Sequence, residues 1–251
     1  MSNLIPNRII IGTSRLGSVV GTPKRQFKFL DSVVEAGFKT FDLAASYQIG
    51  GTERMFGRWI QQNQRRENLF LISKGGHPYP FISNRLSILA LRADLESSLK
   101  RLRTDYLDLF LLHRDHPKAD LNAIAEFLVA MRDSGKIKAF GVSNWYHERI
   151  AELDIDIAAS SVHFSKSPWE KPPFKGVVSI AGHKNQPARD FYAETQIPIL
   201  AWSPVRGLNK EEVQDSLRYL ASQKFPVYPI LGSRKLKHLL ENQEIFLQEL
   251  G

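Results

Sequence analysis

The sequence predicts an α/β protein with one domain over residues 1–251, folded as a closed (β/α)8 TIM barrel. Three observations support this fold. Short apolar runs alternate with longer stretches of helical apolar spacing about eight times. No linker or internal repeat interrupts the alternation, and 251 residues is close to the usual length of such a barrel. An open doubly wound sheet is the alternative, but no G-x-G-x-x-G motif follows the first apolar run.

The predicted strands are runs rich in Ile, Val, Leu and Phe that end at polar or turn residues. In chain order they cover residues 8–12 (RIIIG), 40–44 (TFDLA), 69–74 (LFLISK), 106–113 (YLDLFLLH), 137–143 (IKAFGVS), 157–164 (IAASSVHF), 197–202 (IPILAW) and 227–231 (VYPIL).

The predicted helices lie between these runs, where apolar residues recur three and four positions apart. They lie near 25–36, 52–63, 87–102, 121–134, 146–152, 186–195, 209–223 and 235–248. Between 164 and 184 both periodicities fail, because five breaking residues interrupt them: Pro168, Pro172, Pro173, Gly176 and Gly182. A long loop is therefore expected there, and long loops in compact domains usually carry function.

The amino-acid composition excludes several classes of site and partner. The chain contains no cysteine, which excludes disulfide scaffolds, cysteine nucleophiles and thiolate zinc sites, and no metal site is expected. The 34 Lys and Arg exceed the 26 Asp and Glu and give a net charge of +8. The basic residues form short groups such as Lys24–Arg25 rather than a long stripe, so nucleic acid is not an expected partner. No apolar run reaches the roughly 18 residues of a membrane span, and the first residues do not resemble a secretory leader, so a cytoplasmic location is expected.

Polar side chains stand at the ends of three consecutive predicted strands, where a parallel barrel carries its chemistry. Asp42 interrupts TFDLA, Tyr47 follows five residues later, Lys74 closes LFLISK and His113 closes YLDLFLLH. Each residue alone has an ordinary structural role as a turn former, surface ring, rim charge or core histidine. Together their chemistry is complementary: Lys74 can favour the phenolate of Tyr47, Asp42 can keep Lys74 charged, and His113 can donate a hydrogen bond to a substrate carbonyl.

This set of four resembles the catalytic residues of the aldo-keto reductases, which fold as the same barrel. The resemblance covers nearly the whole chain and includes GKIKAFGVSN (135–144), LAWSPVRG (200–207) and ILGSRKLKHLLEN (230–242). It implies a reductase that interconverts aldehydes or ketones and alcohols with NADPH (NADP+). Tyr47 would be the general acid, assisted by Asp42, Lys74 and His113. The implied partner is a small-molecule carbonyl substrate, and a monomer is expected.

The resemblance also implies cofactor contacts. Ser143 and Asn144 match the pair that binds the nicotinamide carboxamide, and Trp202 matches the stacking aromatic ring. Residues 230–242 match the segment that holds the 2′-phosphate, where Gly232 allows close approach and a helix start adds its dipole. The further expected contacts are Gly12, Thr13, Ser203, Ser233, Arg234, Lys235, Glu241 and Asn242.

The sequence departs from the family pattern at three places. Ser161 stands where the family usually has a glutamine, so the nicotinamide would be held less tightly. His238 replaces a usual arginine, so the preference for NADPH over NADH would be milder. The sequence ends with its last predicted helix, whereas many relatives continue in a tail that walls the substrate pocket. We therefore expect an open pocket bounded by residues 75–86, 114–120 and 164–184, with an apolar wall made by Tyr79, Phe81 and Trp169.

Two other functions remain open at this point. The first is a nicotinamide-binding barrel with little turnover that senses redox state or regulates a partner. The second is an isomerase- or aldolase-type barrel in which Lys74 forms a Schiff base. Cofactor-dependent carbonyl reduction by the pure protein separates the first from a reductase, and borohydride trapping on Lys74 identifies the second.

Overall fold

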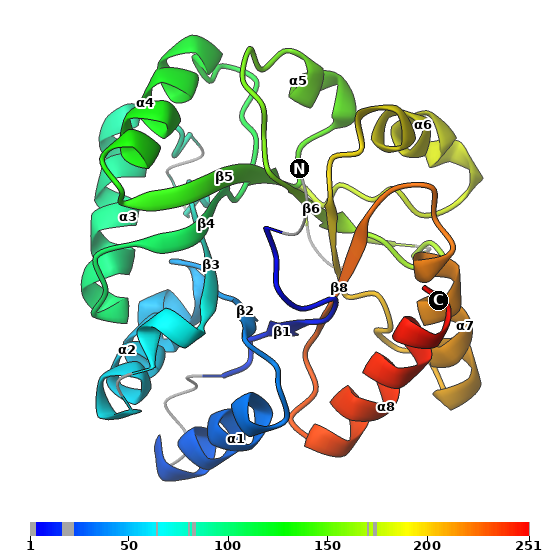
Figure 1. Cartoon of the computed structure of the whole chain (residues 1–251). Helices are drawn as coiled ribbons and strands as arrows, with labels where there is room; N and C mark the ends of the chain where they lie inside the picture. The colour runs from blue at the N-terminus through cyan, green and yellow to red at the C-terminus, as the bar shows by residue number, and fades with distance from the viewer. Residues whose placement is uncertain are drawn as a thin grey trace.

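The computed structural model is a closed barrel in which the eight strands pair in chain order and β1 pairs with β8 (Figure 1). It describes residues 4–16, 23–63, 65–79, 81, 84–169, 171–172 and 175–250. All strand pairs are parallel. The strands are β1 (Ile10–Gly12), β2 (Thr40–Asp42), β3 (Phe70–Gly75), β4 (Leu107–Leu112), β5 (Ile137–Ser143), β6 (Ser160–His163), β7 (Ile199–Trp202) and β8 (Val227–Leu231). The predicted fold class is confirmed.

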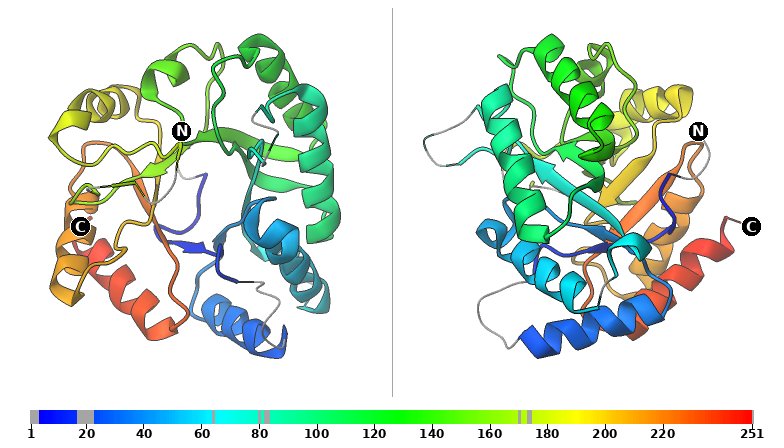
Figure 2. Two further views of the ribbon diagram at one scale, coloured as in Figure 1. Left: turned by 180° about the vertical axis from the view of Figure 1, so that it is seen from behind. Right: turned by 60° about the vertical axis from the view of Figure 1, so that its left-hand side comes forward.

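The helices form an outer ring around the strands, as both views in Figure 2 show. They are α1 (Pro23–Glu35), α2 (Gly51–Asn63), α3 (Ile88–Leu102), α4 (Leu121–Asp133), α5 (His147–Ala151), α6 (Gln186–Thr195), α7 (Lys210–Ala221) and α8 (Leu236–Gln248). Side-chain caps explain several starts: Ser87 accepts from Ala90 N at the start of α3, and Asn209 closes a capping box with Glu212 at the start of α7. None of the described helices is long and apolar enough to cross a membrane.

The observed strands match the predicted ones at β5 and β8. Strand β3 has the predicted length but is shifted by one residue, and the other strands are shorter. The largest difference is β6, because residues 157–159 of the apolar run precede the first position that pairs with β7. The predicted loop at 164–184 contains a short 3-10 turn at His183–Asn185, and Ser179 forms an isolated parallel bridge with His163. Pro173 in this loop, and residues 80, 82 and 83 of the 75–86 segment, lie outside the described residues.

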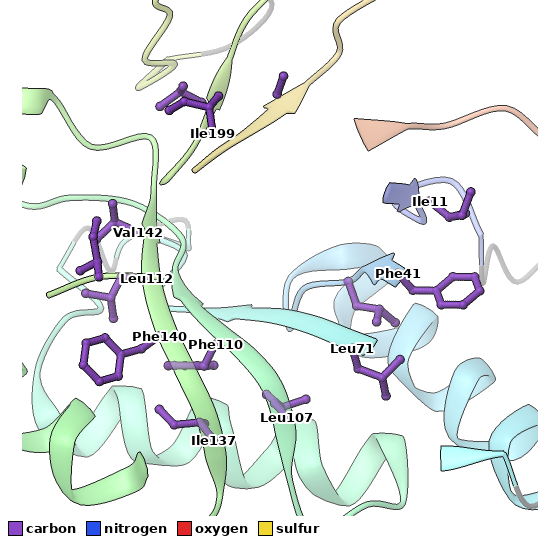
Figure 3. Packing of buried hydrophobic residues seen from close by; sticks show 14 of the residues in the cluster. Ile11, Phe41, Leu71, Leu107, Phe110, Leu112, Ile137, Phe140, Val142 and Ile199 are labelled. Carbon is purple, nitrogen blue, oxygen red and sulfur yellow. The ribbon is translucent and has the colours of Figure 1, made fainter. Parts of the chain in front are cut away.

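Apolar side chains form two layers, one on the outer face and one on the inner face of the barrel strands. The outer layer packs strands against helices and includes Leu71, Phe110, Leu112 and Phe140 (Figure 3). The inner layer fills the barrel interior; it comprises Ile5, Ile10, Phe70, Ile72, Leu109, Leu111, Ala159, Leu200, Tyr228 and Ile230. The layers alternate along each strand because successive side chains of a strand point to opposite faces.

The same alternation places polar residues above the inner apolar layer. In β3, Lys74 follows Phe70 and Ile72 at a spacing of two, so its side chain enters the barrel. After β4, His113 follows Leu109 and Leu111 in the same way. The carboxyl ends of the strands therefore deliver their chemistry-bearing side chains into one mouth.

Candidate active site

A cavity of about 2030 Å³ opens at the carboxyl ends of the strands. Its floor consists of strand-end residues: Gly12, Asp42, Lys74, His113, Ser143, Ser161, Trp202, Ile230 and Gly232. Drug-sized ligands occupy about 300–1,000 Å³. The cavity is therefore large enough for a dinucleotide and a small second molecule.

Asp42, Lys74 and Tyr47 form one connected polar group in this mouth. The Lys74 Nζ lies 2.6 Å from Asp42 Oδ1 and donates to Tyr47 Oη at 2.9 Å. It also donates to the carbonyl of Leu43 at 2.9 Å. The Tyr47 hydroxyl donates to Asp42 Oδ2 at 3.3 Å. Because Lys74 and Asp42 are both buried, the ion pair is shielded from water and fixes the ammonium beside the phenol.

The backbone around Tyr47 explains why this side chain reaches the group although it lies beyond its strand. Ala45 N donates to Lys74 O at 3.0 Å, which ties the turn after β2 to the end of β3. Tyr47 then opens a 3-10 turn in which Gln48 and Ile49 both adopt positive φ. The turn directs the phenol back over the barrel mouth, where it lines the cavity.

The charges in the group set its protonation state. Burial and the Asp42 carboxylate raise the pKa of Tyr47, and the nearby Lys74 ammonium only partly opposes them. Lys74 does favour the phenolate, as the sequence indicates, but burial and Asp42 outweigh its effect on the pKa of Tyr47. Burial lowers the pKa of Lys74, but Asp42 and Tyr47 outweigh burial and leave the pKa raised. At neutral pH Lys74 is therefore charged and Tyr47 carries its proton.

His113, the fourth residue of the predicted set, lies beside the Tyr47 ring. The two rings meet edge to face with centroids 6.0 Å apart, and His113 Nδ1 lies 3.4 Å from Ser46 Oγ. Burial lowers the pKa of His113 well below its ordinary value, and the charge of Lys74 adds to this. The imidazole is therefore neutral and retains one N–H for a hydrogen bond.

The other half of the floor carries groups that suit a nicotinamide. Ser143, Asn144, Ser161 and Trp202 all line the cavity. The buried Ser161 hydroxyl has no hydrogen-bond partner, which is costly unless a bound group supplies one. Asn144 donates to Ser143 Oγ at 3.0 Å and holds an αL backbone with φ of 56°. The residues present therefore fit a carboxamide ligand.

The cavity wall near α8 suits a phosphate-bearing group. Lys237 lines this wall, whereas the predicted Arg234 and Lys235 do not. A Cβ built at Gly232 meets nothing within 4 Å, so the backbone there is open to a ligand. Ser203, Ser233, His238, Glu241 and Asn242 line the cavity as predicted for cofactor contacts.

Three other predicted contacts do not lie on the described cavity wall. Arg234 and Lys235 are exposed beside it, so the expectation that they contact the cofactor gains no support. Thr13 is buried and donates its hydroxyl to the carbonyl of Asp42 at 2.7 Å. Its role in the structure is to support the strand end that carries Asp42.

The three aromatic residues predicted as candidates for an apolar wall gain no support from the described cavity. Tyr79, Phe81 and Trp169 are not among the residues that line the cavity, and Phe81 is fully exposed. Trp169 instead stacks on His163, with ring centroids 3.6 Å apart. His163 and Trp169 each lie 5.4 Å from the ring of Trp202, so this aromatic group supports Trp202 from the side.

The cavity wall also includes residues that the sequence patterns do not single out, among them Ser46, His77, Arg114 and Lys237. Arg114 directly follows His113 in LLHRD, so its place beside a strand end is the signal that could have found it. Lys237 stands four residues before Glu241, and their charged groups lie 3.8 Å apart on α8. Ser46 and His77 both contact His113, which lies on a different loop from either of them. Contacts between separate loops leave no local pattern in the sequence.

The sequence model of the Aldo/keto reductase family matches residues 8–216. The chain belongs to this family of oxidoreductases. The match covers all the strands except β8 and includes Asp42, Tyr47, Lys74 and His113.

Comparison with individual members shows moderate similarity. The aldo-keto reductase YhdN of Bacillus subtilis is 31% identical over 170 residues, which are 65% of this chain and 50% of YhdN. The methylglyoxal reductase YeaE of Escherichia coli is 37% identical over 144 residues, 57% of this chain and 47% of YeaE. This chain thus matches about half the length of each. An aldo-keto reductase of Klebsiella pneumoniae, solved in complex with NADPH, shares the fold, with a TM-score of 0.74 and 24% identity over 95% of this chain and 85% of that one.

Proposed function

We propose that this aldo/keto reductase family member reduces small aldehydes or ketones to alcohols with NADPH and that Tyr47 is the general acid. The observation that carries the proposal is the contact of the Tyr47 hydroxyl with Lys74 Nζ at 2.9 Å, inside a cavity large enough for cofactor and substrate. The names of YhdN and YeaE and the NADPH complex of the Klebsiella protein support the same chemistry.

The residues divide into two functional halves. Ser143, Asn144, Ser161 and Trp202 would hold the nicotinamide, and Gly232, Ser233, Lys237, His238 and Asn242 would hold the adenosine phosphate. When bound, NADPH supplies the hydride that reduces the carbonyl carbon.

Tyr47 and His113 would act on the substrate oxygen. A neutral His113 with its proton on Nε2 would present this N–H to the carbonyl and orient it, while Nδ1 faces Ser46 Oγ at 3.4 Å. The Tyr47 hydroxyl rotates from Asp42 to the oxygen and transfers its proton as negative charge develops there. Lys74 stays protonated and stabilises the phenolate that remains.

The Schiff-base alternative requires a neutral amine on Lys74. The ion pair with Asp42 at 2.6 Å and the raised pKa of Lys74 keep this amine protonated, which argues against that alternative. The second candidate is a nicotinamide-binding barrel that turns over little, and measured carbonyl reduction distinguishes it from a reductase.

The test uses the purified protein with NADPH and a panel of aliphatic and aromatic aldehydes that includes methylglyoxal. We expect NADPH consumption that depends on the carbonyl compound and yields one alcohol per NADPH. Saturable NADPH binding without alcohol formation across the panel would instead support the regulatory barrel. Borohydride treatment with substrate should leave no adduct on Lys74.

A further inference from the structure

The described part of the cavity wall carries more positive than negative charge. Among the described residues, seven Lys and Arg line it, against three Asp and Glu. Each of the three acidic groups lies beside a basic one: Asp42 beside Lys74, Asp115 beside Arg149 and Glu241 beside Lys237. A cavity with this balance concentrates anions.

Part of the positive charge lies away from the half of the cavity that suits the cofactor. The closed barrel places β4 four strands from β8, so the loop after β4 faces the Gly232–Asn242 wall across the mouth. Arg114 and Lys175 line the cavity on this opposite side. These two cations therefore lie apart from the wall that suits the adenosine phosphate.

Arg114 is held close to the reacting group. It follows His113 directly at the end of β4 and is half-buried. One terminal nitrogen donates to the carbonyl of Gly176 at 2.7 Å, which fixes the guanidinium against the loop that carries Lys175. The Arg114 charge is close enough to lower the pKa of both His113 and His77.

His77 cannot be the source of positive charge at this end. Its ring meets the His113 ring with centroids 4.7 Å apart, and its Nδ1 bonds the Pro78 carbonyl at 2.7 Å. Burial lowers the pKa of His77, and the Arg114 charge adds to the effect, so the ring is neutral at pH 7. Arg114 therefore adds a second positive charge beside His113, apart from the Lys74 ammonium that is paired with Asp42.

We propose that Arg114 binds a carboxylate on the substrate, so that the preferred substrates are aldehydes or ketones that also carry a carboxylate. This rests on the proposed reductase function and assigns its substrate class. A guanidinium presents a planar set of donors that matches a carboxylate, and a partly desolvated site strengthens the contact. Lys175, which is exposed at the rim, adds charge that attracts the anion.

The test compares 4-carboxybenzaldehyde with its neutral methyl ester, methyl 4-formylbenzoate. The ester group withdraws more electron density from the aldehyde than the carboxylate does, so intrinsic reactivity favours the ester. A preference for the acid therefore reports recognition of its charge. In the wild type we expect kcat/KM for the acid to exceed that for the ester about 10-fold or more.

Variants assign the effect to Arg114. Arg114→Gln should lower the acid-to-ester ratio of kcat/KM by about 10- to 100-fold, mainly through KM of the acid. Arg114→Lys should retain part of the preference, because an ammonium keeps the charge without the planar set of donors. Arg132→Gln removes the same charge from the exposed end of α4, outside the cavity wall, and should leave the ratio unchanged.

A second readout separates this proposal from the reductase function. Calorimetric titration of both compounds into the protein with NADP+ measures affinity without turnover. Tighter binding of the acid that is lost in Arg114→Gln supports the carboxylate site even if neither aldehyde is reduced. An acid-to-ester ratio, in rate or affinity, that is the same in wild type and Arg114→Gln overturns it while leaving the reductase proposal standing.

Discussion

The ammonium of Lys74 lies 2.6 Å from the Asp42 carboxylate and 2.9 Å from the Tyr47 hydroxyl, so one buried cation joins the end of β3 to both the end of β2 and the turn that follows it. Burial alone would favour loss of the proton from Lys74, but the adjacent carboxylate prevents it. The three groups therefore form a unit that keeps a proton on Tyr47 and a positive charge beside it.

Replacing Tyr47 by Phe removes this proton and keeps the ring. General acid catalysis contributes about 10²–10⁴ in rate, so kcat for carbonyl reduction should fall at least 100-fold. NADPH affinity, measured by fluorescence titration, should change less than about twofold. Tyr79→Phe makes the same chemical change at a residue off the described cavity wall and should leave kcat unaffected. Near-normal kcat in Tyr47→Phe, with a substrate deuterium effect showing that hydride transfer limits the rate, would contradict the assignment.

Variants of Lys237 and Arg234 test which basic residue binds the 2′-phosphate of NADPH. Of the two, only Lys237 lies on the described cavity wall. A charge contact to phosphate contributes about 1.5–3 kcal/mol, and the exposure of Lys237 favours the lower end. Lys237→Ala should therefore weaken NADPH binding about 10-fold and leave NADH binding nearly unchanged. Arg234→Ala, the matched control, should change NADPH affinity less than about twofold. The opposite ranking of the two variants would place the 2′-phosphate beside Arg234.

Ser161→Ala tests whether the unpartnered hydroxyl serves the nicotinamide. A hydrogen bond contributes about 0.5–1.5 kcal/mol net, so NADPH should bind about 2- to 10-fold more weakly. The melting temperature of the cofactor-free protein should stay level or rise, because the variant removes a buried hydroxyl that lacks a partner.

The neighbouring Ser160 is the control for this variant. Its hydroxyl lies 2.9 Å from the Tyr192 hydroxyl, so Ser160→Ala should lower the melting temperature without changing NADPH affinity. Unchanged NADPH affinity in Ser161→Ala would leave the hydroxyl without a cofactor role.

His163 predicts a loss of stability at acid pH. Burial lowers the pKa of His163 from 6.5 to about 4, so the unfolded chain binds a proton more readily than the folded protein between these values. The stability contributed by neutral His163 is fully present above pH 6.5 and is lost as the pH falls toward 4. Between pH 8 and pH 5 this loss is about 2 kcal/mol.

Urea unfolding at pH 8 and pH 5 measures the effect. In His163→Gln the difference in unfolding free energy between the two pH values should shrink by about 2 kcal/mol. The exposed His183 serves as the control, and His183→Gln should keep the wild-type difference. An unchanged pH dependence in His163→Gln would show that His163 is not charged on unfolding in this range.

The sequence by itself determined the barrel and the direction of its main polar side chains. Alternating strand and helix patterns require parallel strands joined by crossover helices, and eight such units close on themselves. The spacing of two from Ile72 to Lys74 and from Leu111 to His113 places both polar groups inside the barrel. Local periodicity records this information because it reports which face of an element is buried.

Tertiary structure alone decided which side chains share a volume. The segment after β8 places Lys237 but not Arg234 on the described cavity wall, and Trp169 stacks on His163 off that wall. The closeness of Asp42 and the burial of the phenol raise the pKa of Tyr47 despite Lys74. These outcomes depend on distances between residues far apart in sequence and on the exclusion of water, which a linear pattern does not encode.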